Sequence, residues 1–488
     1  MDIYFKFLRK GNYLNFVSKV MEQEYEIVQS KVISQLEYFH KKIKKNLVVL
    51  FEYPYVEKHF RDSYYFYFST KHREIKRNSI RLSFFTDNVN ETFFRDSKKH
   101  PQLQESFLGF ITLRPTKMSI VGRSLISPKL FNETNFVLTL SSFSVLINGV
   151  KLWINAFPHC SQDQETLSCA ETTILNIMEY FGNKYPEYTP ILPSRIIKIL
   201  SGKANARQLP SSGLTTEDLS FALKQLGFSP KVYSKDIVGN EKFKKILDIY
   251  IESGIPVIGA LEDNNSGHAV IFNGREKLFE NENREHEFSN HDFDFSQIVK
   301  KYVLIDDNHP PYSFVPYSNI TELYNDKSFK NFKLTSIISP LYSKIYVDAE
   351  LAIDFFENIK EHFLSNYEHY ASRIFLASSR SFKNSIVKQL ELNSEIKTLI
   401  VETAMPKFVW IIEIFDKESY NKKTIKGLMI IDATETNLSI TDHLLFSLFN
   451  GKLIVFKNGK FIPKKINMDN FQIFADNLKG EHNSWKSY

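Results

Sequence analysis

Cysteine is scarce in this chain, because its 488 residues include only Cys160 and Cys169. Two cysteines cannot form the disulfide framework of a secreted domain, and they cannot complete a four-ligand zinc site by themselves. We therefore expect both side chains to be free thiols in a reducing compartment. The expected location is the cytoplasm.

Long hydrophobic runs are also missing. No window reaches the roughly 18 uninterrupted apolar residues that a membrane-spanning helix needs. The start of the chain, Met1 to Lys10, lacks the continuous apolar stretch and the small-residue cleavage site of a signal peptide. The sequence therefore predicts no membrane partner.

The chain has no strong excess of charge of one sign. Its formal net charge is +6, and lysine-rich segments such as Lys41–Lys45 are offset by acidic ones elsewhere. Proteins that bind nucleic acids usually gather basic residues into one patch or stripe. We therefore expect no nucleic-acid partner.

What the chain does contain is ample core material, with 43% hydrophobic residues. The length suggests about three domains, and no internal repeat of fixed period indicates a solenoid. We expect an α+β protein in three parts. Residues 1–150 would form an N-terminal helix plus antiparallel strands, 151–335 a middle domain, and 340–488 a C-terminal α/β domain of unknown role.

Residue patterns predict several elements of these parts. Apolar residues return every three to four positions over 13–45, which predicts a helix. Short apolar runs at 47–51 and 80–85 predict strands, and Asn148-Gly149 between alternating apolar runs predicts a hairpin. An antiparallel sheet would therefore lead into the cysteine segment.

Cys169 lies at the predicted start of a helix. Ser168 and Glu171 have the spacing of a capping box, which makes Ser168 the N-cap and Cys169 the first helical residue. The positive end of a helix favours the thiolate, the form of cysteine that attacks a carbonyl carbon. The residues that would bury one side of this helix are Ala170, Ile174, Ile177, Met178 and Phe181.

A cysteine nucleophile needs a base, a group that orients this base, and donors for the oxyanion. His268 heads an apolar strand, and the next strand-like run, 302–305, ends at Asp306. In an antiparallel pair the start of one strand lies near the end of the other, so Asp306 would fall beside His268. Asp307, the next residue, is an equal candidate for this position beside His268. Gln162 and Gln164 precede the cysteine, and the amide of either would help the Cys169 N–H to bind an oxyanion.

These elements together resemble the papain-like cysteine peptidases over roughly residues 150–320, and within them most closely the bacteriocin-processing peptidases that remove double-glycine leaders. The matching segments, in chain order, are Gln162-Asp163 with Ser168-Cys169-Ala170, Gly213-Leu214-Thr215, Gly254-Ile255-Pro256-Val257-Ile258, Gly267-His268-Ala269-Val270 and Val303-Leu304-Ile305-Asp306. The resemblance implies a central helix that bears the cysteine and packs on an antiparallel sheet.

The resemblance also implies roles for these residues. Cys169 would be the nucleophile, His268 the general base and acid, and Asp306 the orienting carboxylate, with Asp307 as its alternate. Gln162 would be the oxyanion donor, with Gln164 as its alternate. Family members carry the glutamine six residues before the cysteine, where this chain has an aspartate, and glycine after the cysteine, where this chain has alanine.

The expected reaction is hydrolysis of a peptide or isopeptide bond through a thioester acyl-enzyme, without a cofactor or metal. The substrate would be a protein or peptide, and the C-terminal domain could bind a partner protein. Two alternatives stay open. The same triad could pass the acyl group to an amine, as transglutaminases and arylamine acetyltransferases do, or the domain could be an inactive papain-like binding module.

For four further residues, ligand binding is one of two possible interpretations. Arg114 and Arg123 stand beside turn residues at strand ends, where they would bind an anion or, more commonly, tie down a loop. His286 and His291 lie among acidic residues in a charged segment, an arrangement that suggests a metal site. We expect no metal there, because a surface insertion lacks a rigid frame.

Overall fold

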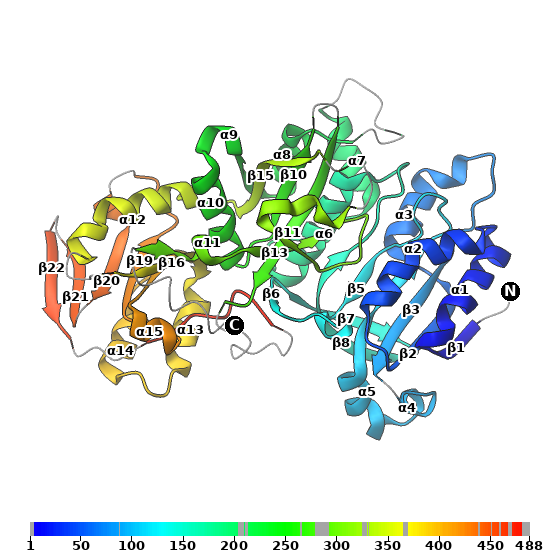
Figure 1. Cartoon of the computed structure of the whole chain (residues 1–488), viewed down its shortest axis with the longest axis horizontal. Coiled ribbons are helices and arrows are strands. Elements are labelled where there is room, and N and C mark those ends of the chain that lie inside the picture. Colours follow the sequence, from blue (N-terminus) through cyan, green and yellow to red (C-terminus); the bar gives the residue numbers. More distant parts are fainter. Residues whose placement is uncertain are drawn as a thin grey trace.

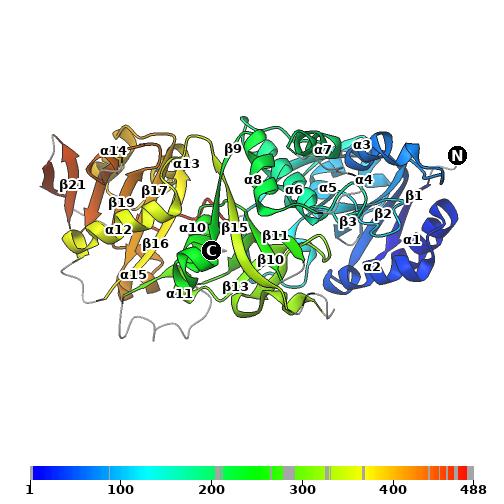
Figure 2. The same ribbon diagram turned by 90° about the horizontal axis from the view of Figure 1, so that it is seen from above.

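The computed structural model describes residues 4–480 except 87, 204–208, 210–212, 264–265, 279–291, 325–328, 330, 365–368, 438–439, 450, 458–459 and 467–470. It is a mixed α+β structure with 38% helix and 33% strand, which confirms the expected fold class at this level. Three seven-stranded sheets dominate the described residues. Figure 1 and Figure 2 show the second sheet between the other two, so the molecule is elongated.

The first sheet has the strand order β1-β2-β3-β4-β5-β8-β7 and is antiparallel throughout. In β7, buried and exposed residues alternate, as expected for a strand with one face in solvent. Its strands are β1 (Tyr4–Arg9), β2 (Leu47–Tyr55), β3 (Ser79–Thr86), β4 (Phe107–Leu113), β5 (Ser124–Ile126), β7 (Ser141–Ile147) and β8 (Val150–His159). The helices of this part are α1 (Lys10–Tyr25), α2 (Gln29–Lys42), α3 (Lys58–Phe66), α4 (Thr92–Arg95) and α5 (His100–Ser106), with the 3₁₀ turns η1 (Phe68–Thr70), η2 (Ser97–Lys99) and η3 (Pro128–Leu130).

The single helix predicted over 13–45 is wrong in one respect, because the chain forms two helices there. Helix α1 ends at Glu26, whose φ of 57° is left-handed, and α2 starts at Gln29. The apolar repeat continues through this break because both helices bury one side, Val17 and Met21 in α1 and Val32 in α2, in the same core. Periodicity alone therefore does not reveal the turn.

The hairpin predicted at Asn148-Gly149 is confirmed. Strands β7 and β8 pair in antiparallel register around it, with Ile147 opposite Val150. Asn148 and Gly149 have φ values of 45° and 83°, the left-handed conformation that a two-residue hairpin turn of this kind requires.

The second sheet has the order β14-β13-β11-β10-β15-β9, and the short strand β6 also pairs with β11. Helix α6 packs against β11 of this sheet and against β8 of the first sheet. The strands are β6 (Phe136–Leu138), β9 (Phe228–Ser234), β10 (Val257–Glu262), β11 (Gly267–Glu276), β13 (Lys301–Ile305), β14 (Ser313–Pro316) and β15 (Lys333–Tyr342). The helices are α6 (Cys169–Lys184), α7 (Pro193–Ser201), α8 (Thr216–Gln225), α9 (Lys235–Val238) and α10 (Asn240–Glu252), and η5 (Tyr317–Leu323) is a 3₁₀ segment.

The third sheet has the order β12-β16-β17-β19-β20-β21-β22. Its strands are β12 (Phe293–Asp294), β16 (Ala371–Ser378), β17 (Phe408–Phe415), β19 (Gly427–Asp432), β20 (Leu444–Phe449), β21 (Lys452–Lys457) and β22 (Lys460–Lys465), and β18 (Thr424–Ile425) pairs separately with β23 (Phe471–Gln472). The helices are α11 (Phe295–Ile298), α12 (Ala349–Leu364), α13 (Ser379–Lys388), α14 (Ser394–Glu402), α15 (Lys417–Asn421) and α16 (Ile440–His443).

The limits of the sheets differ from the predicted domain boundaries at 150 and 335–340. Strand β8 starts at Val150 yet belongs to the first sheet, whereas β6, earlier in the chain, joins the second. Strand β15 runs through the second boundary, and β12 lies before it but pairs in parallel with β16 of the third sheet. A short strand from each of the first two predicted parts, β6 and β12, therefore joins the sheet of the following part.

Buried ion pairs connect the second and third sheets. Glu252, at the end of α10, accepts hydrogen bonds from Arg275 on β11 and, at 2.8 Å, from Arg373 on β16. Arg373 also donates to Glu413 at 2.7 Å. All four side chains are at most 1% exposed, so this network lies inside the protein.

A segment close to residue 480 completes the same interface. The Arg373 guanidinium donates to the Phe474 carbonyl at 2.9 Å, and the Asn477 amide donates to the Glu252 and Leu376 carbonyls. Lys479 exchanges two backbone hydrogen bonds with Leu138 on β6. Residues 474–479 therefore bridge the second and third sheets.

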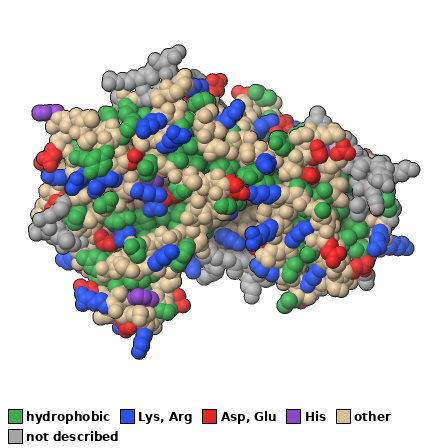
Figure 3. Space-filling view, turned by 180° about the vertical axis from the view of Figure 1, so that it is seen from behind, with side chains coloured by type: hydrophobic (Ala, Val, Ile, Leu, Met, Phe, Trp, Pro, Cys, Tyr) green, Lys and Arg blue, Asp and Glu red, His purple; other side chains and the backbone are tan. Residues whose placement is uncertain are grey.

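No helix among the described residues is long and apolar enough to cross a membrane. On the face shown in Figure 3, acidic and basic side chains are interspersed rather than gathered over one half of the molecule.

Candidate active site

The helix start predicted at Ser168 is confirmed, and Cys169 is the first residue of α6. The Ser168 backbone N–H donates to the Glu171 carboxylate at 3.0 Å, and the Ser168 hydroxyl donates to the same oxygen. Both interactions satisfy polar groups that the helix start leaves open. Cys169 itself is only partly buried, unlike Cys160.

The loop before this helix is held by Asp163. Its carboxylate accepts hydrogen bonds from the backbone N–H groups of Glu165, Thr166 and Leu167 at 2.7–2.9 Å. Arg114 donates to the Ser161 carbonyl at 2.8 Å and lies 4.0 Å from Asp163. Asp163, at the position where the resemblance leads one to expect glutamine, therefore orders the loop.

Arg114 and Arg123 both make internal contacts, as in the loop-tying alternative. Arg123 donates to Glu179 of α6 at 2.6 Å, and Lys58 lies 3.2 Å from the same carboxylate. Burial opposes ionisation of Glu179, but Arg123 and its basic neighbours lower the pKa of this carboxyl to about 2. The cysteine helix is thus tied to the first sheet by charge.

His268 is the second residue of β11 and reaches Cys169 from the second sheet. The backbone N–H of Ala269, the residue after His268, donates to the Cys169 sulfur at 3.4 Å, and the Cys169 side chain is close enough to contribute to the raised pKa of His268. Helix α6 and strand β11 therefore bring thiol and imidazole together.

The predicted antiparallel pairing is confirmed, because β11 pairs with β13 and Ile271 lies opposite Ile305. This register places Asp306, directly after β13, at the start of β11. The His268 Nε2 atom lies 2.9 Å from Asp306 Oδ1. Since the Asp306 carboxylate is an acceptor, Nε2 carries the proton and Nδ1 is the nitrogen that remains for Cys169.

Asp306 is surrounded by donors that the sequence pattern did not indicate. Its oxygens accept hydrogen bonds from the Asn308 backbone N–H at 3.0 Å, His309 Nδ1 at 2.8 Å and the Tyr324 hydroxyl at 2.5 Å. His159 lies at 3.0–3.1 Å from the backbone carbonyls of Asp306 and His309. Only Asn308 and His309 had a local signal, as polar residues on the same turn.

The electrostatics of the triad favour an ion pair. Burial alone would lower the pKa of His268, but the charge and hydrogen bond of Asp306 raise it well above its ordinary value. Burial would raise the pKa of Asp306, but His268 and His309 hold it well below its ordinary value. An imidazolium beside a cysteine stabilises the thiolate.

The two alternates, Gln164 and Asp307, differ in their contacts from Gln162 and Asp306. The Gln162 amide donates to the Asn308 side chain at 3.2 Å, so it reaches the turn that bears Asp306, whereas Gln164 is exposed. Asp307 Oδ1 is 3.6 Å from His268 Nε2, too far for a hydrogen bond. The structure therefore places Gln162 and Asp306, rather than their alternates, in hydrogen-bonded positions.

Cys160, the other cysteine, is 3% exposed, and its sulfur lies 3.6 Å from Asn176 Oδ1. Burial raises the pKa of its thiol above the ordinary value. Cys160 therefore has the environment of an inert core residue.

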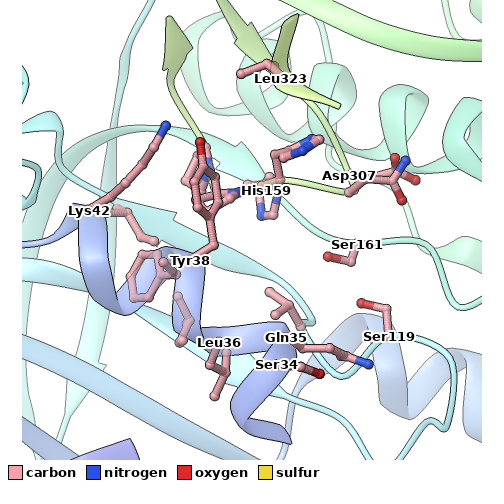
Figure 4. Close-up of a pocket in the computed structure, with 18 of the residues that line it drawn as sticks. Ser34, Gln35, Leu36, Tyr38, Lys42, Ser119, His159, Ser161, Asp307 and Leu323 are labelled. Carbon is pink, nitrogen blue, oxygen red and sulfur yellow. Dashed lines mark hydrogen bonds between the residues drawn. The ribbon is translucent and has the colours of Figure 1, made fainter. Parts of the chain in front are cut away.

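A cavity of about 710 Å³ is lined by Ser161, which precedes Cys169 in the chain, and by the turn that follows Asp306, but not by Cys169, His268 or Asp306 themselves. It lies between α2 of the first part and the 307–311 turn that follows Asp306. Figure 4 shows Tyr38 and Lys42 of α2 on one side of this cavity and Ser161 and Asp307 on the other. The loop before Cys169 and the turn after Asp306 thus each contribute to its wall.

One group in the described part of the chain has the composition of a metal site. Ligand atoms of His268, Asp306 and Asp307 lie within 4.8 Å of one another. His268 Nε2, however, donates its proton to Asp306, so its lone pair is not available for a cation in this arrangement. We interpret the group as a proton-transfer cluster. His286 and His291 lie outside the described residues.

Comparisons of the chain with protein-family models and with curated protein sequences give no match. The functional argument therefore depends on the geometry of the site.

Proposed function

We propose that the protein is a papain-like cysteine peptidase that hydrolyses a peptide or isopeptide bond. The observation that carries this proposal is the juxtaposition of three groups. Cys169 begins a helix, the strand that bears His268 contacts its sulfur through the next backbone N–H, and Asp306 holds the imidazole of His268 at 2.9 Å. Nucleophile, base and orienting group in this order are what acyl transfer by a thiol requires.

In the proposed reaction the Cys169 thiolate attacks the carbonyl carbon of the substrate. The oxyanion that forms is stabilised by the Cys169 backbone N–H at the helix start and by the Gln162 amide. The His268 imidazolium then gives its proton to the leaving amine, and a thioester remains on Cys169. His268 next takes a proton from water, the hydroxide attacks the thioester, and the acid product leaves with the thiolate restored.

The polypeptide on one side of the scissile bond would lie in the cavity between α2 and the 307–311 turn. Tyr38, which is 41% exposed, offers a flat apolar surface, and Lys42 lies over its ring at 4.6 Å. The N-terminal part would thus help to select the substrate. A reducing cytoplasm, which we propose as the location, would keep Cys169 in the thiol state.

Labelling with iodoacetamide at about pH 6 tests the proposal, because only a thiol with an activating base reacts quickly there. We expect Cys169 to be alkylated at least about tenfold faster than Cys160, as measured by mass spectrometry of the two peptides. His268→Ala should slow the alkylation of Cys169 by about tenfold, and Cys169→Ala should abolish peptide hydrolysis.

The proposal fails if Cys169 reacts no faster than Cys160 or if His268→Ala leaves the rate unchanged. A product that carries an added amine, with little hydrolysis, would instead indicate an acyltransferase that uses the same triad.

A further inference from the structure

Asp307 differs from its neighbour Asp306 in a way that the triad does not explain. It is only 6% exposed, yet neither of its carboxylate oxygens has a hydrogen-bond partner among the described residues. Buried carboxylates are normally hydrogen-bonded or paired, since an isolated charge is costly to bury. An exception beside a reactive site needs a functional explanation.

The surroundings of Asp307 couple it to the base. Its Oδ1 lies 3.6 Å from His268 Nε2, the nitrogen that donates to Asp306. The titratable groups that it faces come from its own turn, from β11, from the residue after η5 and from the end of β8. They are Asp306, His268, Tyr324 and Cys160; His309 pairs with Asp306 on the same turn, and the charge of Arg114 acts on Cys160.

We propose that Asp307 is a positioning residue of the triad, which sets how firmly His268 holds the proton of Cys169 by adding or removing a second negative charge beside the imidazole. This inference rests on the proposed function. With Asp307 charged, the imidazolium faces two carboxylates and the thiolate–imidazolium pair is favoured. With Asp307 neutral, Asp306 alone supports the imidazolium and the pair is less populated.

The change falls in the physiological range. Burial raises the pKa of Asp307 to about 7, helped by the charge of Asp306 and opposed by His268. Asp307 therefore keeps its proton below this pH and becomes charged above it, so the population of the reactive ion pair rises as the pH passes through about 7.

The same charge should make the folded protein less stable at high pH. A carboxyl whose pKa is raised on folding favours the folded state at low pH, and this advantage is lost as the pH rises toward the folded pKa. A neutral side chain of the same shape avoids the loss. Replacement of a residue with a purely structural role would not raise the stability of the protein and lower the reactivity of Cys169 at the same time.

Asp307→Asn tests the inference in the full-length protein, with the exposed Asp236→Asn as matched control. Iodoacetamide labelling of Cys169 is followed from about pH 5 to about pH 9. We expect the wild type and the control to show a rise in rate near pH 7. In Asp307→Asn this rise should be absent, and at about pH 8 its rate should be about tenfold below that of the wild type. Its Tm should exceed that of the wild type at about pH 8 but not at about pH 4.

The inference is overturned if Asp307→Asn keeps the rise near pH 7, or if its Tm at high pH falls below that of the wild type. If Cys169 reacts slowly at every pH in all three proteins, the proposed function itself fails and the inference falls with it. If Cys169 is labelled fast but the pH profile of Asp307→Asn matches that of the wild type, only the role of Asp307 is contradicted and the proposed function stands.

Discussion

At the scale of single residues, Asp306 receives hydrogen bonds from four donors on separate parts of the site. His268 lies on β11, Asn308 and His309 lie on the turn itself, and Tyr324 follows η5. A carboxylate with this many donors keeps its charge and a single orientation. The imidazole of His268 is therefore held in one orientation, as the proposed proton transfer from Cys169 would require.

Tyr324→Phe should lower the rate of Cys169 labelling and of peptide hydrolysis by about tenfold, because Asp306 loses a short hydrogen bond and gains freedom to rotate. The rates are measured at about pH 6, and circular dichroism checks the fold. Tyr346→Phe, at a residue that is 54% exposed, is the matched control and should behave as the wild type. An unchanged rate in Tyr324→Phe would show that the other three donors suffice.

The residues with a local signal could be found from the sequence. Cys169 has a capping box, and His268 and Asp306 stand at strand ends that antiparallel pairing brings together. His159 and Tyr324 have no such signal, because they meet Asp306 from 147 and 18 residues away. Their positions depend on how the end of the first sheet and the 3₁₀ segment, which packs against β14 and β15, are placed around Asp306. Sequence periodicity does not contain that information.

At the scale of elements, helix α6 is the part on which both neighbouring sheets converge. Its first residue is Cys169, its side packs against β8 and β11, and Glu179 in its third turn pairs with Arg123. Because the Arg123–Glu179 pair is buried, it is screened little by solvent, and it fixes the helix against the first sheet.

Glu179→Gln should remove a contribution to stability that depends on pH in the wild type. The pKa of Glu179 is about 2 in the folded protein and about 4.3 for an unperturbed glutamate, so the charged form stabilises the fold above about pH 4 by about 3 kcal/mol. This stabilisation is lost as the pH falls from about 4 toward 2. We therefore expect the variant to be less stable than the wild type at neutral pH, with a difference that shrinks in acid.

Urea unfolding at several pH values measures this difference. Glu402→Gln, at an exposed position of α14, serves as the control and should show no such trend. A constant difference between Glu179→Gln and the wild type from neutral pH down to about pH 3 would contradict the assignment.

At the scale of the whole molecule, the second and third sheets share a buried network of charges centred on Glu252, Arg373 and Glu413. Such a network adds less stability than an apolar interface of the same size, but the loss of Arg373 would leave Glu413 buried without this counter-charge and Glu252 with Arg275 alone. The interface therefore has one permitted arrangement.

Arg373→Met should lower the free energy of unfolding by about 3–5 kcal/mol, because Glu252 and Glu413 lose a shared partner. Chemical denaturation measures the change, and Arg380→Met, at an exposed position in α13, is the control. A second unfolding transition in Arg373→Met would indicate that the third sheet separates from the second. A loss below about 1 kcal/mol would contradict the importance of this network.

The α+β class followed from the sequence, but the limits of the sheets did not. Strands β6 and β12 are two or three residues long and pair with distant partners, β11 and β16. Such short segments carry no recognisable period, and their pairing is decided by packing. The predicted limits at 150 and 335–340 therefore fall inside or beside strands that belong to the neighbouring sheet.

The bridge formed by residues 474–479 has a consequence for biosynthesis. Leu138, Glu252 and Arg373 all emerge from the ribosome before the segment that joins them. The strands around the triad can pair earlier, but β6 gains its last neighbour, Lys479, only when translation has passed that residue. Chains truncated after residue 465 would contain the strands of both sheets without the bridge. A comparison of the truncated with the full chain would show whether the labelling rate of Cys169 depends on this last segment.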